Sequence, residues 1–241
     1  MKILVTGRNG FIAKNVIEFF QDKHGYELML YSHEESEEIL RELCKKCDFI
    51  YHLAAVQRSE NLEDFYNGNV CFTKKIIHFL EQEENFVPII FASSTQVKNK
   101  SVFSITKLEA EKILSDYSLK NKVPVFIYRL NHIFGKFGKP NFNNVVSTFL
   151  YNAANNKPFL INSLNATITL TYIDDLIEDF ISCHTIKQNV NKNNLMYPSK
   201  KTEIRLIDLL MIIANIQQGC INLNDSIVQH LYETYKYFKN M

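Results

Sequence analysis

Short apolar runs alternate with helix-like segments through the first 130 residues, and this alternation constrains the fold more than any other feature of the chain. Neighbouring parallel strands need a crossover of about a dozen residues or more, which a helix supplies. Such crossovers are right-handed, which fixes most of the topology. The pattern therefore predicts an α/β chain with a doubly wound parallel sheet. The expected strands are 2–6, 27–31, 48–53, 88–93 and 123–129, and the expected helices are 12–20, 35–44, 69–80 and 106–117.

The alternation ends near Gly135, and the rest of the chain has a different pattern. A chain of 241 residues has room for one to two domains at about 150 residues each. We expect a single domain over 1–241, with a core of about 1–135 and 173–186 and a small substrate lobe of about 136–172 and 187–241. In the later sequence we expect helices at 145–154, 174–183, 204–216 and 226–238, strands at 159–161 and 167–172, and a loop at 188–199.

Composition excludes several classes of protein. Hydrophobic residues make up 46% and charged residues 22%, which is typical of a globular chain. A net charge of +1 gives no basic surface for nucleic acid, and no apolar run reaches the ~18 residues of a membrane span. The five scattered cysteines favour the reducing cytoplasm. Cys44 and Cys47 form a C-x-x-C pair without a second pair or a histidine cluster, so we expect no metal.

The turn after the first expected strand carries the sequence TGRNGFIA at 6–13. Gly7 allows a tight turn, Gly10 lets the backbone approach a pyrophosphate, and Ala13 lets the helix pack on the strand. The helix N-terminus offers free N–H groups and a partial positive charge to phosphates. A dinucleotide site in a Rossmann-like sheet is predicted, with a plain turn as the alternative. Its expected cofactor-binding residues are Gly7, Arg8, Asn9, Gly10, Phe11 and Ile12.

This turn and several later segments resemble the extended short-chain dehydrogenases/reductases of the NAD-dependent epimerase/dehydratase type. The resemblance covers residues 1 to about 185, and its motifs occur in the family's order. Segments 48–58, 129–143 and 231–237 are similar to the reductase domain of capsule enzymes that reduce UDP-2-acetamido-2,6-dideoxy-4-ketohexoses. The later motif residues are His52-Leu53-Ala54-Ala55, Asn69, Ser93-Ser94, Arg129, Phe134-Gly135 and Tyr172-Ile173-Asp174-Asp175.

The resemblance implies NADPH-dependent C4 reduction of a UDP-4-keto-6-deoxy-N-acetylhexosamine in capsule or O-antigen synthesis. In such enzymes a serine binds the carbonyl, a tyrosine gives the proton, and a lysine holds the nicotinamide ribose. Ser94 and Lys107 match the serine and lysine, but Phe103 stands at the tyrosine position. Loss of a general acid costs about 10²–10⁴ in rate. A catalytically inactive binding module is therefore one alternative, and an epimerase or dehydratase is another; Thr95 and Gln96 supply no acid for a dehydratase.

His132 takes the place of the family's usual asparagine. A histidine titrates near pH 6.5, which suits proton donation. Packing beneath the cofactor is the alternative and the favoured interpretation.

The second expected strand ends on Tyr31-Ser32-His33 with no acid at its end, and Glu34 and Glu35 are expected to begin the next helix. An acid at that end would bind the ribose 2′-hydroxyl of NAD. Its absence favours NADP(H) over NAD(H), with Arg8 and His33 meeting the 2′-phosphate. A solvated turn residue is the alternative for Arg8.

The resemblance implies further partners and site residues. Members of this family commonly dimerise through helices that correspond to 69–80 and 106–117, so a homodimer is expected. Capsule relatives carry a cupin epimerase domain after the reductase domain, so a separate cupin epimerase is an expected partner, with loss or excision as alternatives. The remaining expected cofactor residues are His33, Leu53, Ala54, Ala55, Asn69, Ala92, Ser93, Lys107 and His132, and the expected substrate residues are Arg58, Ser94, Asn131, Asn141 and Asn143.

Overall fold

The structure is a computed structural model that describes residues 1–142, 144–159, 161, 165–186 and 195–241. The backbone divides into two compact units, one of Met1–Leu130 with Phe180–Tyr197 and one of Asn131–Asp179 with Pro198–Met241. The boundaries between core and lobe that the sequence predicts follow residues 135, 172 and 186. The boundaries between the two units of the structure follow Leu130, Asp179 and Tyr197. Their behaviour as a single domain stays a prediction.

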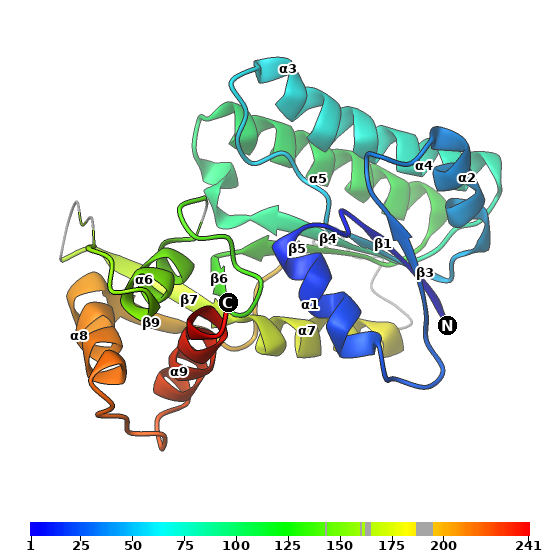
Figure 1. Cartoon of the computed structure of the whole chain (residues 1–241). Coiled ribbons are helices and arrows are strands. Elements are labelled where there is room, and N and C mark those ends of the chain that lie inside the picture. Colours follow the sequence, from blue (N-terminus) through cyan, green and yellow to red (C-terminus); the bar gives the residue numbers. More distant parts are fainter. Residues whose placement is uncertain (143, 160, 162–164, 187–194) are drawn as a thin grey trace. The chain divides into compact units, whose positions relative to one another are not determined.

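The first unit is built on a parallel six-stranded sheet in the order β2-β1-β3-β4-β5-β8 (Figure 1). Val5 in the centre pairs with Leu30 on one side and Tyr51 on the other. The predicted doubly wound sheet is confirmed, and β8 adds a short edge strand inside the expected loop 188–199. The strands are β1 Lys2–Thr6, β2 Glu27–Tyr31, β3 Phe49–His52, β4 Ile89–Ser94, β5 Val125–Leu130 and β8 Leu195–Met196.

Helices cover both faces of this sheet. In Figure 1, α2 (Glu37–Lys46), α4 (Phe72–Gln82) and α5 (Val102–Asn121) lie on one face and α1 (Phe11–Phe20) on the other. A buried cluster that includes Ile50, Ile89 and Ile127 from the strands joins the sheet to the first group. Strands buried on both faces are continuously apolar, which is why the first half of the sequence reads as short apolar runs.

The helix expected at 69–80 begins earlier than predicted. Asn61 caps α3 (Leu62–Phe65) by accepting a hydrogen bond from the Glu63 N–H, and a π-helical stretch, Tyr66–Cys71, joins α3 to α4. Such wide turns are frequent at functional sites. The helix expected at 106–117 also begins earlier, because the Ser101 side chain caps α5. Lys107 therefore lies in the first turns of α5 and not at its very start.

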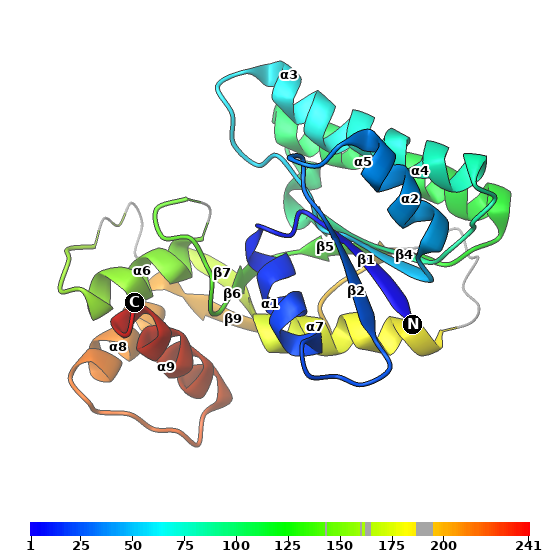
Figure 2. The same ribbon diagram turned by 45° about the vertical axis from the view of Figure 1, so that its right-hand side comes forward.

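The second unit holds a three-stranded sheet in the order β6-β7-β9. Helices α6, α8 and α9 lie together beside this sheet (Figure 2). The predicted start of the helix at 204–216 was wrong, because Ile204 pairs with Ile168 in the antiparallel β7–β9 ladder. The elements are β6 His132–Phe134, α6 Val145–Ala154, β7 Thr167–Tyr172, α7 Ile173–Ser182, β9 Thr202–Arg205, α8 Leu206–Gln217 and α9 Ser226–Lys239.

The structure differs from the sequence-based expectation at two further strands. Of the strand expected at 159–161, Leu160 lies outside the described residues, and Phe159 and Ile161 are not in a strand. Strand β6 had not been expected at all, since three residues between a motif and a glycine carry little periodicity. In the described part of the chain, no helix combines the length and apolar character that a bilayer crossing requires.

Candidate active site

The sheet order places a binding crevice at the carboxyl ends of β1 and β3. The chain leaves β1 for β2 on one side and later returns to β3 on the other. At such a reversal the loops diverge and leave room for a ligand. The two loops meet at Gly7, where an added Cβ would lie 2.7 Å from Ala54 Cα. Gly7 also has φ +72°, so both its conformation and its close approach to the loop after β3 require glycine.

The glycine turn leaves the start of α1 open to an anion. The Gly10 N–H donates to Gly7 O at 2.8 Å, and Gly10 occupies the N-cap of α1 with no side-chain cap. The first-turn N–H groups of Phe11 and Ile12 point out of the helix end, where the dipole favours negative charge. These features fit a pyrophosphate at the predicted position.

A buried histidine ties this turn to the loop after β3. His52 Nδ1 lies 2.9 Å from Thr6 Oγ1, and its Nε2 lies 2.9 Å from Thr73 Oγ1. Because Thr73 donates to Asn69 O at 2.6 Å, its oxygen accepts from the histidine Nε2–H. Thr6 then donates to Nδ1 while its oxygen accepts the Ala54 N–H at 3.2 Å. Burial lowers the pKa of His52 to about 3, so the ring is neutral.

Replacing His52 with leucine is expected to lower the free energy of unfolding by about 2–4 kcal/mol. The change leaves the Thr6 and Thr73 hydroxyls without their ring partner inside the core, and each unsatisfied buried group costs about 1–3 kcal/mol. Urea unfolding followed by circular dichroism measures the loss. His78→Leu on the exposed face of α4 is the control, and a loss no larger than that of His78→Leu would contradict the described network.

Asn69 positions the loop after β3 through its side-chain amide. Its Oδ1 accepts from the Val56 N–H at 2.9 Å, and its Nδ2 donates to Val56 O at 3.1 Å and to Thr106 Oγ1 at 3.0 Å. The residue lies in the π-helical stretch and is 2% exposed. Both amide hydrogens are therefore used within the protein, so Asn69 supports the cofactor loop rather than presenting its side chain to a ligand. The neighbouring expected residues Leu53 and Ala55 are half-buried on that loop.

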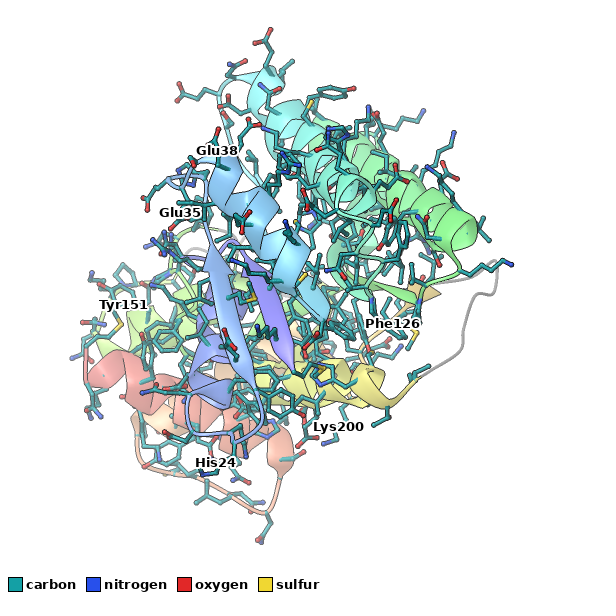
Figure 3. All side chains as sticks on the ribbon, turned by 90° about the vertical axis from the view of Figure 1, so that its right-hand side faces the viewer. His24, Glu35, Glu38, Phe126, Tyr151 and Lys200 are labelled. Carbon is teal, nitrogen blue, oxygen red and sulfur yellow. The ribbon has the colours of Figure 1, made fainter. Side chains whose placement is uncertain are left out.

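An acid does lie at the end of β2, contrary to the expectation from the sequence. Glu35, which Figure 3 labels, precedes α2. Its carboxylate turns back to accept from Ser32 N at 2.5 Å and from Ser32 Oγ at 2.8 Å. Arg8 Nη2 lies 2.7 Å from the other Glu35 oxygen. Hydrogen bonds from Ser32, with the Arg8 charge, lower the pKa of Glu35. The local sequence did not reveal this, because a side chain four positions past the end of β2 reaches back to the strand only in the folded chain. His33 is exposed.

The predicted serine lies at the end of β4, and the predicted lysine lies in the second turn of α5. Ser94 Oγ accepts from the Gln96 N–H at 3.1 Å, so its hydroxyl hydrogen can still be donated to a carbonyl oxygen. Ser104 Oγ donates to Gln96 O at 2.7 Å and so ties the first turn of α5 to the turn after Ser94. Phe103 is half-buried in that helical turn, and Lys107 follows one turn later. Ala92, another expected cofactor residue, is half-buried in the same strand as Ser94.

Lys107 is a buried lysine with an unusual environment. The residue is 1% exposed, and its Nζ lies 3.8 Å from the centroid of the Phe91 ring. Within the described residues Nζ has no hydrogen-bond partner. Burial lowers the pKa of Lys107 to about 7, and the charge of Glu111 opposes that shift. An orphaned buried amine beside the crevice fits the ribose hydroxyls of a dinucleotide, which would complete its hydrogen bonds.

Glu111, one turn after Lys107, is held by other partners. Arg129 Nη2 lies 2.7 Å from Glu111 Oε2, and Arg129 Nε donates to Oε1 at 3.0 Å. Ser93 Oγ donates to the same Oε1 at 2.5 Å. The sequence placed Ser93 among the cofactor residues, but here its hydroxyl supports Glu111. The sequence analysis did not identify Glu111 as a site residue. Its position four residues after Lys107 could have done so, because residues four apart share one face of a helix.

The remaining predicted residues have less defined surroundings. Arg58 is exposed in the first unit, and Asn143 lies outside the described residues. In the second unit Asn131 Oδ1 is buried and has no partner among the described residues, while Asn141 is exposed and its N–H donates to Thr148 Oγ1 at 2.9 Å. His132 lies in β6, and burial lowers its pKa, which makes the imidazole neutral at pH 7. No group of three metal-ligating side chains occurs within the described ranges.

UDP-2-acetamido-2,6-beta-L-arabino-hexul-4-ose reductase from Pseudomonas aeruginosa is 36% identical over 181 residues, which are 75% of this chain and 49% of that protein. The chain thus spans about half the length of this curated relative. GDP-6-deoxy-D-talose 4-dehydrogenase from Aggregatibacter actinomycetemcomitans is 35% identical over 86 residues, 32% of this chain and 29% of that protein.

Solved structures share the fold over the whole chain. The capsular polysaccharide assembling protein CapF from Staphylococcus aureus matches with a TM-score of 0.87 at 28% identity, over 99% of this chain and 66% of that one. UDP-glucuronic acid 4-epimerase from Bacillus cereus, crystallised with NAD, matches with a TM-score of 0.85 at 18% identity, over 100% of this chain and 99% of that one. The family model described as NAD dependent epimerase/dehydratase matches residues 3–194. The chain therefore belongs to the NAD dependent epimerase/dehydratase family.

Proposed function

We propose that this protein uses a reduced nicotinamide dinucleotide to reduce the C4 keto group of a UDP-4-keto-6-deoxy-N-acetylhexosamine. The observation that carries the proposal is Lys107, a buried amine without a hydrogen-bond partner among the described residues, in the helix whose first turn Ser104 ties to the turn after Ser94. The similarity to a UDP-sugar 4-keto reductase supports the substrate class. The similarity to a capsular polysaccharide assembling protein supports a role in capsule or O-antigen synthesis.

When bound, the dinucleotide supplies the hydride. The protein's own residues bind and orient: the glycine turn and the first N–H groups of α1 take the pyrophosphate, and Lys107 donates to ribose hydroxyls. Ser94 donates its hydroxyl hydrogen to the substrate carbonyl oxygen, which favours the developing alkoxide. Phe103 contributes an apolar ring where the family's proton donor stands.

The decisive assay mixes the protein with the UDP-4-keto sugar and reduced dinucleotide, and follows both dinucleotide oxidation and the appearance of the C4 alcohol by mass spectrometry. Stoichiometric formation of both products is expected. The second candidate is a binding module without turnover, which the Phe103 ring specifically favours. Tight binding of dinucleotide and sugar nucleotide, with no oxidation by the wild type or by Phe103→Tyr, would establish that second candidate.

We extend the proposal to the setting of the reaction. All five cysteines are free thiols, which supports a cytoplasmic location. Ile105, Leu108 and Leu119 of α5 are about half exposed, at 57%, 48% and 50%, which supports a homodimer that covers this helix. A separate cupin epimerase remains a proposed partner.

The choice between NADP(H) and NAD(H) is affected by Glu35. The sequence favoured NADP(H) because β2 appeared to end without an acid, but the Glu35 carboxylate lies at that end and takes up Arg8. Glu34 adds a second carboxylate, 3.9 Å from Arg8. A 2′-phosphate dianion would have to displace the Arg8–Glu35 pair and face two carboxylates, whereas a ribose hydroxyl can donate to Glu35. We therefore propose that NADH binds more tightly than NADPH.

Glu35→Gln is expected to reduce the NADH preference by about tenfold or more, since a hydrogen bond to a charged group is worth about 1.5–3 kcal/mol. The change also frees Arg8 for a phosphate. Calorimetric titration of the full chain with NADH and NADPH measures both dissociation constants. Glu38→Gln is the matched control, because it removes the same charge from an exposed residue of α2 that lies outside the pair of Arg8 and Glu35. A wild-type preference for NADPH would contradict this proposal and restore the expectation from the sequence.

A further inference from the structure

Reduction of a ketone leaves an alkoxide that must receive a proton, and the Phe103 ring has none to give. Three hydroxyls lie nearby in sequence, but each one donates to a backbone carbonyl. Thr95 donates to Leu130 O at 3.2 Å, Ser104 to Gln96 O at 2.7 Å and Thr106 to Phe103 O at 3.0 Å. Their hydrogens are therefore committed to holding the β4–α5 connection, and none of them is placed to relay a proton.

Lys107 differs from these groups because its amine is committed to nothing within the described residues. The face of the Phe91 ring lies 3.8 Å from Nζ. A cation over an aromatic face is attracted but keeps all its N–H bonds available. The side chain also begins one helical turn after Phe103, so both residues rise from the same face of α5.

The charged groups around Lys107 compensate its ammonium only in part, through the charge of Glu111. Glu111 on α5 is the acid whose charge raises the pKa of Lys107. Its carboxylate oxygens accept hydrogen bonds from Arg129 of β5 and Ser93 of β4. His52 on β3 is neutral and buried, and the positive charge of Lys107 helps to keep it so. The Lys107 amine is therefore buried, while Arg129 pairs with Glu111, the acid that would otherwise stabilise the charged form of Lys107.

We propose that Lys107 is itself the proton donor of the reduction, in the place of the missing tyrosine. The inference rests on the proposed reductase function. The carbonyl carbon accepts a hydride and is reduced, while the dihydronicotinamide is oxidised. The carbonyl π pair becomes an alkoxide lone pair, which forms an O–H bond with a proton from Lys107 Nζ. The N–H bond breaks with its electron pair left on nitrogen, and the neutral amine regains a proton from solvent after product release.

The pH dependence of the reaction follows from this assignment. Because burial lowers the pKa of Lys107 to about 7, the amine carries its proton below neutral pH and loses it above. A donor that titrates near the working pH transfers its proton readily. The turnover number is therefore expected to be flat below pH 7 and to fall about tenfold per pH unit at higher pH.

The first test measures the protonation of Lys107 without any turnover. The full chain is labelled with ¹³C at lysine Cε and titrated by NMR, with and without oxidised dinucleotide. Lys107→Met identifies the resonance by its loss, and it removes a buried charge, so the variant should fold. A resonance that titrates within about one unit of pH 7 is expected. A Lys107 that stays fully protonated to pH 9 in the dinucleotide complex would overturn the proposal.

The second test separates proton donation from charge. Lys107→Arg keeps the cation but never releases a proton. Its turnover number is expected to fall by at least about 10²-fold while the dinucleotide dissociation constant changes less than about tenfold. Lys112→Arg, on the exposed side of α5, is the matched control and should leave both unchanged. If arginine is too large for the site, Lys107→Ala with added ethylamine replaces the test, and a rate increase with amine concentration is expected.

The outcomes keep this inference distinct from the proposed function. If Lys107→Arg keeps the turnover number of the wild type, Lys107 is not the proton donor, but the proposed reductase function stands. A loss of dinucleotide affinity with an unchanged turnover number would lead to the same conclusion, because it marks a purely positioning residue. Failure of the wild type and of Phe103→Tyr to oxidise dinucleotide at any pH would overturn the reductase function and the Lys107 assignment with it.

Discussion

Phe103→Tyr is expected to raise the turnover number for ketosugar reduction by about 10²-fold, which corresponds to about 2.7 kcal/mol of barrier. The substitution adds a phenol at a half-buried position one turn before Lys107. A nearby ammonium favours the ionised phenol and so lowers its pKa, which makes the hydroxyl a better acid. The gain lies at the lower end of the range for general acids, because Lys107 already provides a proton in the wild type.

Steady-state kinetics with the UDP-4-keto sugar and NADH would measure this gain. Phe103→Leu is the control, since it removes the ring without adding a hydroxyl, and it should leave the turnover number within about threefold. The alkaline decline of the wild-type profile should also move to higher pH in Phe103→Tyr, because a phenol keeps its proton beyond the range of Lys107. If Phe103→Tyr reduces the substrate no faster than Phe103→Leu, position 103 is not the proton-donor position.

Arg129→Met is expected to lower the free energy of unfolding by about 3–5 kcal/mol. The guanidinium lies at 15% side-chain exposure against a Glu111 carboxylate at 6%, and its Nε and Nη2 both donate to that carboxylate. Removing one partner of a buried pair leaves an uncompensated charge in the core. Urea unfolding at pH 7 measures the change.

The double variant Arg129→Met/Glu111→Met provides the control for this prediction. It removes both charges, so it should recover much of the lost stability. A double variant as unstable as Arg129→Met would show that lost packing, and not the stranded carboxylate, causes the effect. In Arg129→Met, Glu111 is also released toward Lys107, so the pKa of Lys107 should rise in the NMR titration.

The parallel sheet could be predicted from sequence because its signals are local. Buried parallel strands are apolar throughout, and Gly7 is needed for a left-handed turn whatever surrounds it. The four-residue spacing of Phe103 and Lys107 needs only a helix to place both on one face, and α5 supplies it. The family resemblance placed Ser94 at the end of the strand that precedes α5, and β4 ends at Ser94.

Other parts of the site depend on partners that are distant in the sequence. His52 is bonded to Thr6 and Thr73, which come from β1 and α4, so no local pattern reveals that it is neutral and structural. The β7–β9 ladder is another example, because Ile204 reads as a helical residue until Ile168 is placed opposite it. Long-range pairing decides such cases, and propensity alone cannot.

The sequence by itself determined the sheet, the glycine turn and the absence of a phenol at Phe103, because covalent spacing and local backbone preference fix them. Only the tertiary structure decided the electrostatics of the site. Glu35 reaches back to Ser32 and Arg8, and Arg129 withdraws Glu111 from Lys107. The physical reason is that charges act through space in a medium whose dielectric depends on burial, so their effect on a group is known only when all its neighbours are placed.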